Sequence, residues 1–335
     1  MLGSRLRLIM ASLVAAMMVA GSIQAGDLSA SLKKGTPDIK VAGPLAFGPE
    51  GILFIGDPAG AAIFAIGTAD TKSAANGALK VEGIDEKIGA MLGTNAKGIQ
   101  VNDLAVNPAS GNAYLSVSRG KGPDASSVLI RVQQGGKLEE FPLKDVPFAK
   151  AVLPNPAGNR TQSITKIAFV KDRVIVAGLS NEEWASTLRA IPFPFGDVDK
   201  GASVQIWHGA HGKFETQAPV RTFIPFDING ETHVLAAYTC TPLVKFPLSQ
   251  LKPGEKVKGT TIAELGNRNN PLDMITYQKN GKTYILMANS ARGVMKITTE
   301  NIENSKSITK PVAGGGTDGL TYETIKDLKG VVQLD

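Results

Sequence analysis

The sequence predicts an all-β fold, a β-propeller of six blades. Three observations lead to this prediction. Two short strand patterns alternate along the chain, equivalent positions recur about every 50 residues, and glycine and proline separate the strands. The 335 residues include 37 Gly and 19 Pro, and 43% of them are hydrophobic. This composition favours many turns around a packed core and argues against a helical bundle.

The first pattern is a hairpin of two apolar strands joined by a turn rich in Gly, Pro, Asn or Asp. In the clearest copy, residues 102–106 lead into a turn over residues 107–111, and a second strand follows. Pro108 and Gly111 in this turn are typical of a hairpin connection. Further copies begin at Pro44, Ile167, Thr222, Asp273 and Asp318.

The second pattern is a strand of about four residues that follows each hairpin. Most copies place Lys, Arg or Gln just before a final apolar residue, as expected of a strand with one buried face. The copies span residues 63–66, 129–132, 188–191, 243–246, 294–297 and 331–334.

A unit of three or four short strands that repeats about every 50 residues is typical of a propeller blade. The sixth unit is short. We therefore expect residues 37–41 to supply a strand to it, so that N- and C-terminal segments close the ring and remove two open sheet edges. A general β-sandwich is the alternative. Residues 71–98, rich in Ala and Gly, are expected to form a short helix or a loop.

The first 25 residues have the pattern of a cleaved secretory signal peptide. Arg5 and Arg7 precede an uncharged apolar stretch over residues 8–21, and the small residue Ala25 precedes the expected cleavage point. An uncleaved anchor is the alternative, although the stretch is shorter than the roughly 20 residues of a membrane span. We expect residues 26–335 to form one propeller domain that is periplasmic or secreted, with no membrane span after cleavage.

The charge of the chain does not point to nucleic acid as a partner. The formal net charge is +6, and the two arginines of the signal peptide supply two of these charges. No run of five like charges occurs, so no basic arm is visible. We expect a monomer whose partner is a small molecule or a protein at the mouth of the propeller channel.

Propeller geometry narrows the search for a ligand site. The loops that enter each innermost strand lie on the same face as the loops between second and third strands, and loops on a rigid scaffold often carry function. The polar residues that these loops offer as ligand-binding candidates are Asn102, Asp103, Arg221, Asn270, Asp318, Tyr238, Asn289 and Arg292. The alternative is that these side chains cap turns and tie blades together.

The segment over residues 207–215 holds two of the three histidines of the chain. His208 and His211, with Glu215 nearby, could hold zinc or copper, and His211 is a candidate acid–base catalyst. A structural role or plain solvent exposure is the alternative. Cys240 has no partner for an intramolecular disulfide, so we expect it to be a buried apolar residue.

The blades resemble the six-bladed propellers of the gluconolactonase and NHL-repeat type. Residues 102–108, 271–274 and 316–320 carry the resemblance. It implies a divalent metal such as calcium at one channel mouth, with Asn102 or Asp103, Asn270 and Asp318 at matching positions. The chain departs from that family near Gly43 and Pro44, where the family has an acidic residue.

Two functions follow from these features. The first is a propeller that binds a ligand or protein at its channel mouth without catalysis. The second is a metal-dependent hydrolase of lactones or esters, in which Asp103, Asn270 and Asp318 hold the metal and His211 acts as a base. The sequence has no Gly-x-Ser-x-Gly and no P-loop pattern, which disfavours serine hydrolases of the elbow type and nucleotide hydrolases.

Overall fold

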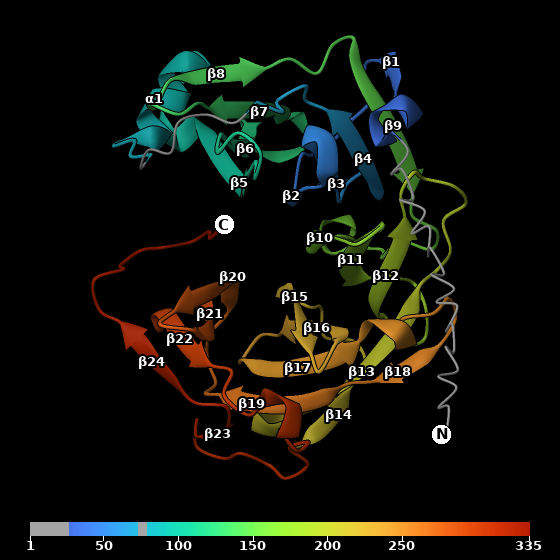
Figure 1. Cartoon of the computed structure of the whole chain (residues 1–335), viewed down its shortest axis with the longest axis vertical. Coiled ribbons are helices and arrows are strands. Elements are labelled where there is room, and N and C mark those ends of the chain that lie inside the picture. The colour runs from blue at the N-terminus through green and yellow to red at the C-terminus, as the bar shows by residue number, and fades with distance from the viewer. Residues whose placement is uncertain (1–26, 73–78) are drawn as a thin grey trace, which may run out of the picture.

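The computed structural model describes residues 27–72 and 79–335, in which most regular structure is β (Figure 1). The strands form five sheets around a common centre, each sheet a blade of a propeller. The all-β propeller is therefore confirmed, but the expected count of six blades is wrong. We number the blades 1 to 5 by the order of their innermost strands in the chain. The predicted signal peptide lies outside the described residues.

Each blade has four or five strands on its main path. From the centre outward, blade 1 contains β2 (Leu45–Phe47), β3 (Ile52–Asp57), β4 (Ala62–Gly67), β9 (Val146–Val152) and β1 (Lys33–Gly35). In the same direction, blade 2 contains β5 (Ile99–Val106), β6 (Ala113–Arg119), β7 (Ser126–Val132) and β8 (Leu138–Phe141). Blade 3 contains β10 (Lys166–Val170), β11 (Arg173–Leu179), β12 (Ser186–Pro192), β13 (Ala202–His208) and β14 (Lys213–Glu215), and β18 (Lys256–Lys258) pairs with β13. Blade 4 contains β15 (Thr222–Ile228), β16 (Glu231–Ala237), β17 (Pro242–Pro247), β19 (Thr260–Leu265) and β23 (Thr317–Gly319). Blade 5 contains β20 (Pro271–Lys279), β21 (Lys282–Asn289), β22 (Gly293–Thr298) and β24 (Tyr322–Ile325).

Helices are short. The α-helix α1 (Ile84–Met91) lies in the segment for which a short helix or loop is predicted. The 3-10 helices are η1 (Leu28–Ser31), η2 (Pro49–Gly51), η3 (Ala96–Gly98), η4 (Gly122–Asp124), η5 (Arg160–Gln162), η6 (Gly209–His211), η7 (Leu248–Gln250) and η8 (Ile302–Asn304). In the described part of the chain, no helix is long and apolar enough to cross a membrane.

The two sequence patterns correspond to defined strands. The hairpin pattern forms the two innermost strands of each blade, and the second pattern forms the third strand. Both predictions are confirmed for the first five copies. The sixth is wrong: Thr317–Gly319 is the outermost strand of blade 4, and Tyr322–Ile325 is the outermost strand of blade 5. Residues 331–334 are not a strand.

The order of the blades around the ring differs from their order in the chain. Strand β9 pairs with β4 of blade 1, although the whole of blade 2 lies between them in sequence. Blade 2 is thus an insertion into blade 1. Because β2 contacts both β5 and β10, blade 1 sits between blades 2 and 3, and the ring order is 2–1–3–4–5.

Burial of apolar side chains explains this order. Four clusters of buried side chains fill the interfaces between neighbouring blades, from blades 2 and 1 to blades 4 and 5. A fifth cluster covers the other face of blade 2, where Ile88 and Leu92 pack on Leu115 and Ile130. The helix α1 therefore supplies the apolar cover that another blade would provide.

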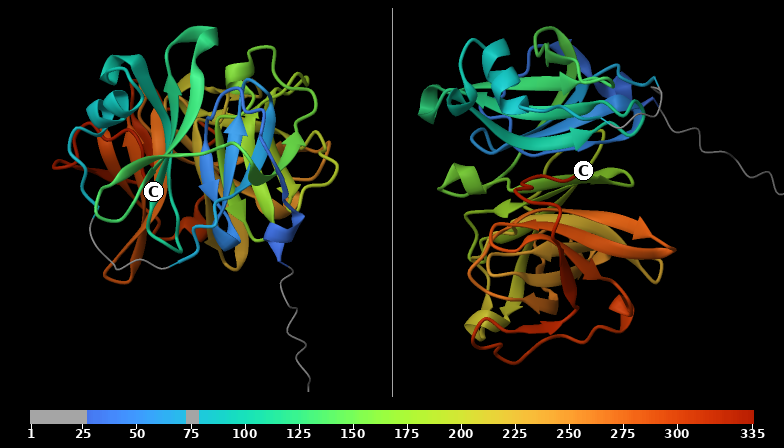
Figure 2. Two further views of the ribbon diagram at one scale, coloured as in Figure 1. Left: turned by 90° about the horizontal axis from the view of Figure 1, so that it is seen from above. Right: turned by 90° about the vertical axis from the view of Figure 1, so that its left-hand side faces the viewer.

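The chain ends meet the ring differently from the sequence prediction. Residues 37–41 form no strand; instead Lys33–Gly35 pairs with β9 at the outer edge of blade 1. The C-terminal segment runs back to the centre between blades 2 and 5 (Figures 1 and 2). There the main-chain N–H of Val106 donates to Asp335, and that of Leu334 donates to Asp273.

Candidate functional site

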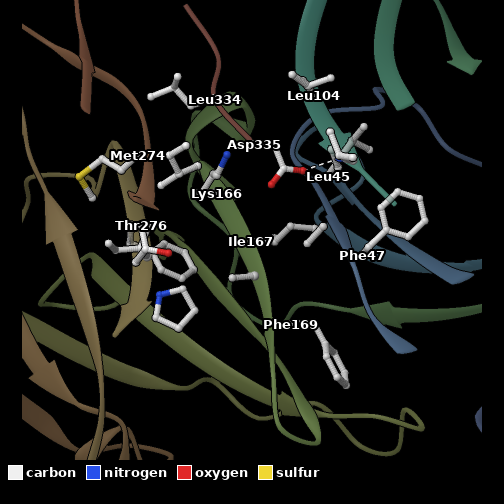
Figure 3. Close-up of a pocket in the computed structure, with 18 of the residues that line it drawn as sticks. Leu45, Phe47, Leu104, Lys166, Ile167, Phe169, Met274, Thr276, Leu334 and Asp335 are labelled. Carbon is white, nitrogen blue, oxygen red and sulfur yellow. Dashed lines mark hydrogen bonds between the residues drawn. The ribbon is translucent and has the colours of Figure 1, made fainter. Parts of the chain in front are cut away.

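The innermost strands of all five blades line a cavity of about 430 Å³ at the centre of the ring (Figure 3). We call it the central cavity. Most of its lining is apolar, and each of the five innermost strands contributes residues to it. The apolar lining includes Leu45, Phe47, Leu104, Ile167, Phe169, Phe223, Ile224, Met274 and Leu334.

A polar layer borders the central cavity. In four strands, one polar residue directly precedes the first apolar lining residue: Asp103, Lys166, Thr222 and Asp273. All four residues are buried or nearly so. Buried charges need partners, so this layer must be neutralised from within the protein or by a ligand.

Lys166 connects two of the carboxylates. Its Nζ lies 2.8 Å from Oδ1 of Asp273 and 3.6 Å from Oδ1 of Asp103. The Asp273 carboxylate also accepts hydrogen bonds from the Thr222 hydroxyl at 3.3 Å and from the main chain of Leu334 at 3.1 Å. Asp273 is therefore well satisfied, whereas Lys166 lies farther from Asp103.

Both aspartates occupy irregular positions in their strands. The register of β5 shifts between Val101 and Asp103, and that of β20 shifts between Pro271 and Asp273. A bulge inserts an extra residue and redirects the following side chain. The same device in both strands that flank the C-terminal segment brings the two carboxylates to the polar layer.

The environment shifts the pKa values of these groups. Burial raises the pKa of Asp103 to about 6, although the Lys166 ammonium opposes this shift. Burial would lower the pKa of Lys166, but the carboxylates of Asp103 and Asp273 outweigh it and raise that pKa. Burial also raises the pKa of Asp335, against the hydrogen bond from Val106.

Asp335 adds a third carboxylate to this group. Its side chain lies beside Lys166 in Figure 3, and one carboxylate oxygen accepts the hydrogen bond from Val106 of β5. We call Asp103, Lys166, Asp273 and Asp335 the cavity cluster. Three carboxylates surround one ammonium group in it, so the cluster carries excess negative charge when its acids are ionised.

The candidates from sequence are spread over several blades. Asp103 belongs to the cavity cluster, and the neighbouring Asn102 donates to the Ala42 carbonyl at 2.8 Å and to the Ser118 hydroxyl at 2.9 Å. Arg221 is exposed just before β15, and Tyr238 is fully buried at the end of β16.

Two further candidates organise a turn. The Asn289 Oδ1 accepts hydrogen bonds from the main chain of Ala291 and Arg292, and its Nδ2 donates to Asn269 at 2.7 Å. The Arg292 guanidinium donates to the carbonyl of Asn267 at 3.0 Å. These contacts fit the alternative prediction, in which the polar side chains cap turns.

The three residues that the resemblance implies for a divalent ion are not brought together. Asp103 lies beside the central cavity, and Asn270 is exposed in the loop before β20, bonded to Thr239 and Ser290. Asp318 is in β23, the strand of blade 4 farthest from the centre. This separation in the fold leaves no shared point for a calcium ion between them.

His211, the candidate acid–base residue, lies outside the central cavity at the end of η6. Its Nδ1 is 2.7 Å from Oε1 of Glu215, while Nδ1 of His208 is 2.9 Å from Oε2 of the same carboxylate. The centroids of the two imidazole rings are 3.8 Å apart. The predicted proximity of His208, His211 and Glu215 is therefore present in the structure.

Sequence reasoning missed Lys166, Asp273 and Asp335 as site residues. A signal was available for Lys166 and Asp273, because each directly precedes a run of mostly apolar residues in the sequence, as Asp103 does. Nothing in the sequence places Asp335 next to them. Its position depends on the path of the C-terminal segment between blades 2 and 5.

No family model and no curated protein sequence matches this chain. Among solved structures, it is similar to a PQQ-bound aldose sugar dehydrogenase from Streptomyces coelicolor, with 12% identity, a TM-score of 0.30, and coverage of 85% of this chain and 88% of the other. It is also similar to a GH32 β-fructofuranosidase from Bombyx mori, with 10% identity, a TM-score of 0.36, and coverage of 90% and 68%. A third match is the extracellular domain of a protein described as a one-component system from B. thetaiotaomicron, with 13% identity, a TM-score of 0.29 and coverage of 87% of this chain. This chain spans 39% of the length of that protein.

Proposed function

We propose that the protein binds a small molecule with an apolar body and a positively charged amino group, in the central cavity. The observation that carries this proposal is the composition of the cavity cluster. Asp103, Asp273 and Asp335 outnumber Lys166 as charged groups, and the side chains of Asp103, Asp273 and Lys166 are buried or nearly so, whereas Asp335 is more exposed. A buried carboxylate without a charged partner is costly, so a cationic ligand would be stabilised there.

The size and lining of the cavity fit such a ligand. Small-molecule sites usually measure about 300–1,000 Å³ and combine apolar walls with a few placed polar groups. The central cavity has about 430 Å³, apolar side chains from five strands, and the cavity cluster at one end. An ammonium group would lie against Asp103 and Asp335, because Asp273 already has partners in Lys166, Thr222 and Leu334.

Isothermal titration calorimetry at pH 7.5 tests the proposal, with phenethylamine and 2-phenylethanol as probes of equal shape. The amine is expected to bind at least about ten-fold more tightly than the alcohol, a difference of about 1.4 kcal/mol. Asp103→Asn should remove most of this preference. Asp172→Asn is the matched control, because Asp172 pairs with Arg173 on the surface. Equal binding of amine and alcohol, or no binding of amines from butylamine to phenethylamine, would contradict the proposal.

The hydrolase considered from the sequence has less support. Its metal would need oxygen ligands from Asp103, Asn270 and Asp318, and these lie in the cavity, an exposed loop and an outer strand. Ligand binding is the function that the cavity geometry supports best.

We also propose that this binding takes place outside the cytoplasm, after removal of residues 1–25. The support is the pattern of Arg5, Arg7, an apolar stretch and Ala25 in the sequence. N-terminal sequencing of the protein recovered from cells is expected to begin at Gly26. A full-length protein in the cytoplasmic fraction would contradict this proposal.

A further inference from the structure

A second group of side chains lies where blades 3 and 4 meet, away from the central cavity. His208 ends β13, His211 ends η6, and Cys240 is in the turn between β16 and β17. One ring nitrogen of each histidine and the sulfur of Cys240 lie within 4.8 Å of one another. We call these three residues the His–Cys cluster.

Glu215 fixes the chemical state of both imidazoles. Its two carboxylate oxygens lie 2.9 Å and 2.7 Å from Nδ1 of His208 and His211, so each ring donates its Nδ1–H to this carboxylate. The lone pair of each neutral ring is then on Nε2. A carboxylate that orients a histidine in this way is the usual outer partner of a metal-ligating imidazole.

His208 shows that the cluster lacks a partner. The residue is 2% exposed, and its Nε2 has no hydrogen-bond partner within the described structure. A buried polar atom without a partner is rare in folded proteins and costs free energy. The lone pair of this nitrogen is available to a cation.

The backbone holds Cys240 in an unusual conformation beside the two histidines. Cys240 and Thr241, in the hairpin turn between Tyr238 and Pro242, both have positive φ angles, of 64° and 53°, which residues other than glycine adopt uncommonly. Main-chain and side-chain bonds maintain it: Cys240 N–H donates to the Asn269 carbonyl at 2.8 Å, and the Thr241 hydroxyl donates to the Gly266 carbonyl at 2.6 Å. The backbone that carries the thiol is thus held by hydrogen bonds at Cys240 and at Thr241.

The segment that carries His208 and His211 is also held by a contact with blade 4. Gly209, the residue after His208, donates its main-chain N–H to Glu264 of blade 4. A Cβ atom at this position would lie 2.8 Å from the Glu264 side chain, so the close approach requires glycine. Blade 4 therefore positions both Cys240 and the loop of blade 3.

We infer that the His–Cys cluster binds one transition-metal ion through two imidazole nitrogens and one thiolate. Zinc and copper are the ions that this donor set suits, because both accept imidazole and thiolate ligands. A tetrahedral zinc ion, with bonds of about 2.0 Å to nitrogen and 2.3 Å to sulfur, separates its ligands by roughly 3.5 Å. The ligand atoms of the cluster lie within 4.8 Å of one another, so each pair has to approach by at most about 1.3 Å to reach this spacing.

The exposure of the cluster predicts the fourth ligand. The side chain of His211 is 45% exposed, and Cys240 is partly exposed, whereas His208 is buried. One side of the ion would therefore face solvent and take water or a small anion. Three protein ligands and one exchangeable ligand are typical of a reactive metal site.

Metal loading of the purified protein tests this inference. After treatment with a chelator, the protein is dialysed against Zn²⁺ or Cu²⁺, and its metal content is measured by mass spectrometry. About one ion per chain is expected. Loading with Co²⁺ should produce a thiolate-to-cobalt charge-transfer band, and bound Zn²⁺ should protect Cys240 from alkylation by iodoacetamide.

Variants show whether metal binding depends on the His–Cys cluster or on other residues of the protein. Cys240→Ser should remove the charge-transfer band, and both Cys240→Ser and His211→Asn should weaken zinc binding at least about ten-fold. His233→Asn is the matched control: His233 is buried at the opposite end of β16, with Nδ1 3.0 Å from the carbonyl oxygen of Glu231. It should bind zinc like the unmodified protein. Circular dichroism shows whether each variant is folded.

The possible outcomes decide the inference. Copper retained in place of zinc, with the same dependence on Cys240 and His211, supports the donor set and identifies the ion as copper. Less than about 0.1 ion per chain after loading would overturn the inference. So would a cobalt spectrum without a thiolate band, or alkylation of Cys240 at equal rates with and without zinc.

Discussion

The cavity cluster and the His–Cys cluster differ in how much of their chemistry the chain itself completes. In the cavity cluster, Lys166 already neutralises part of the charge of Asp103 and Asp273. In the His–Cys cluster, one buried nitrogen of His208 has no partner within the described residues. The first cluster therefore contributes to folding before any ligand binds, whereas the second contains a buried donor atom that the proposed metal ion would satisfy.

The two clusters also differ in what holds them. Three residues of the cavity cluster, Asp103, Lys166 and Asp273, lie in innermost strands, which pack against neighbouring blades. The His–Cys cluster lies at the end of β13, in η6 and in the turn before β17, and the conformation of these segments depends on Glu215, Glu264 and the strained turn at Cys240. Substitutions in the cavity cluster should thus change stability most, and substitutions in the His–Cys cluster should change metal affinity most.

Replacing Lys166 with methionine should have the largest effect. It leaves Asp103 and Asp273 buried without their counter-charge, and breaking a buried ion pair in this way costs about 3–5 kcal/mol. Urea unfolding measures the loss. Lys256→Met is the control, because Lys256 pairs with Glu183 on the surface, where a pair contributes about 0–1 kcal/mol. Equal losses in the two variants would show that the cavity cluster has no special role in stability.

The stability of the protein should depend on the ionisation of Asp103. Its pKa is about 6 in the folded protein and lies near 3.8 when exposed. Protonated Asp103 is favoured by burial, so its contribution is fully present below pH 3.8 and is lost as the pH rises through 6. The loss amounts to at most about 3 kcal/mol.

Comparison with Asp103→Asn isolates this contribution. The free energy of unfolding of the unmodified protein, relative to that of the variant, should fall between pH 5.0 and pH 7.5. Other carboxylates titrate in both proteins and cancel in the difference. A difference that is constant or rises over this range would contradict the burial-driven shift.

Glu215→Gln should affect the His–Cys cluster without a comparable loss of stability. Glutamine has a single acceptor oxygen where Glu215 has two, so the two imidazoles are no longer both held as Nδ1–H donors. Loss of such an outer partner lowers metal affinity about 10–100-fold. Zinc titration measures this change, with Glu183→Gln, an exposed carboxylate, as control. Unchanged zinc affinity would mean that Glu215 does not position the histidines.

Cys240→Gly should have the smallest effect on stability, and of opposite sign. Glycine adopts the positive φ of this position without strain, so the metal-free protein should gain up to about 1 kcal/mol. Cys240→Ser keeps the strained backbone and should show no gain. Thermal unfolding in the presence of a chelator compares the two. A less stable glycine variant would indicate that the thiol contributes to packing instead.

The fold was predictable from sequence to the level of strands and hairpins. The alternation of the two patterns locates the first three strands of every blade, because these strands are local in sequence and apolar. The blade count was not predictable in the same way. Asp318 and Tyr322 begin no hairpin, since their segments pair with β19 and β22 at the outer edges of blades 4 and 5. The insertion of blade 2 also depends on β9, a long-range partner of β4.

The candidate sites show the same limit. His208, His211 and Glu215 are close in sequence, and their proximity was predicted from spacing alone. Cys240 joins them only because blades 3 and 4 are neighbours. Asp103 was selected because an apolar run follows it in the sequence. Lys166 and Asp273 lie beside it only because the innermost strands of blades 2, 3 and 5 meet at the centre of the ring.

A crystal structure of the protein with phenethylamine bound is the most direct test of the proposed function. We expect the ammonium group within hydrogen-bond distance of Asp103 or Asp335, and the aromatic ring against the apolar wall that includes Leu104 and Met274. An amine bound elsewhere on the propeller, with only solvent in the central cavity, would contradict the proposed function.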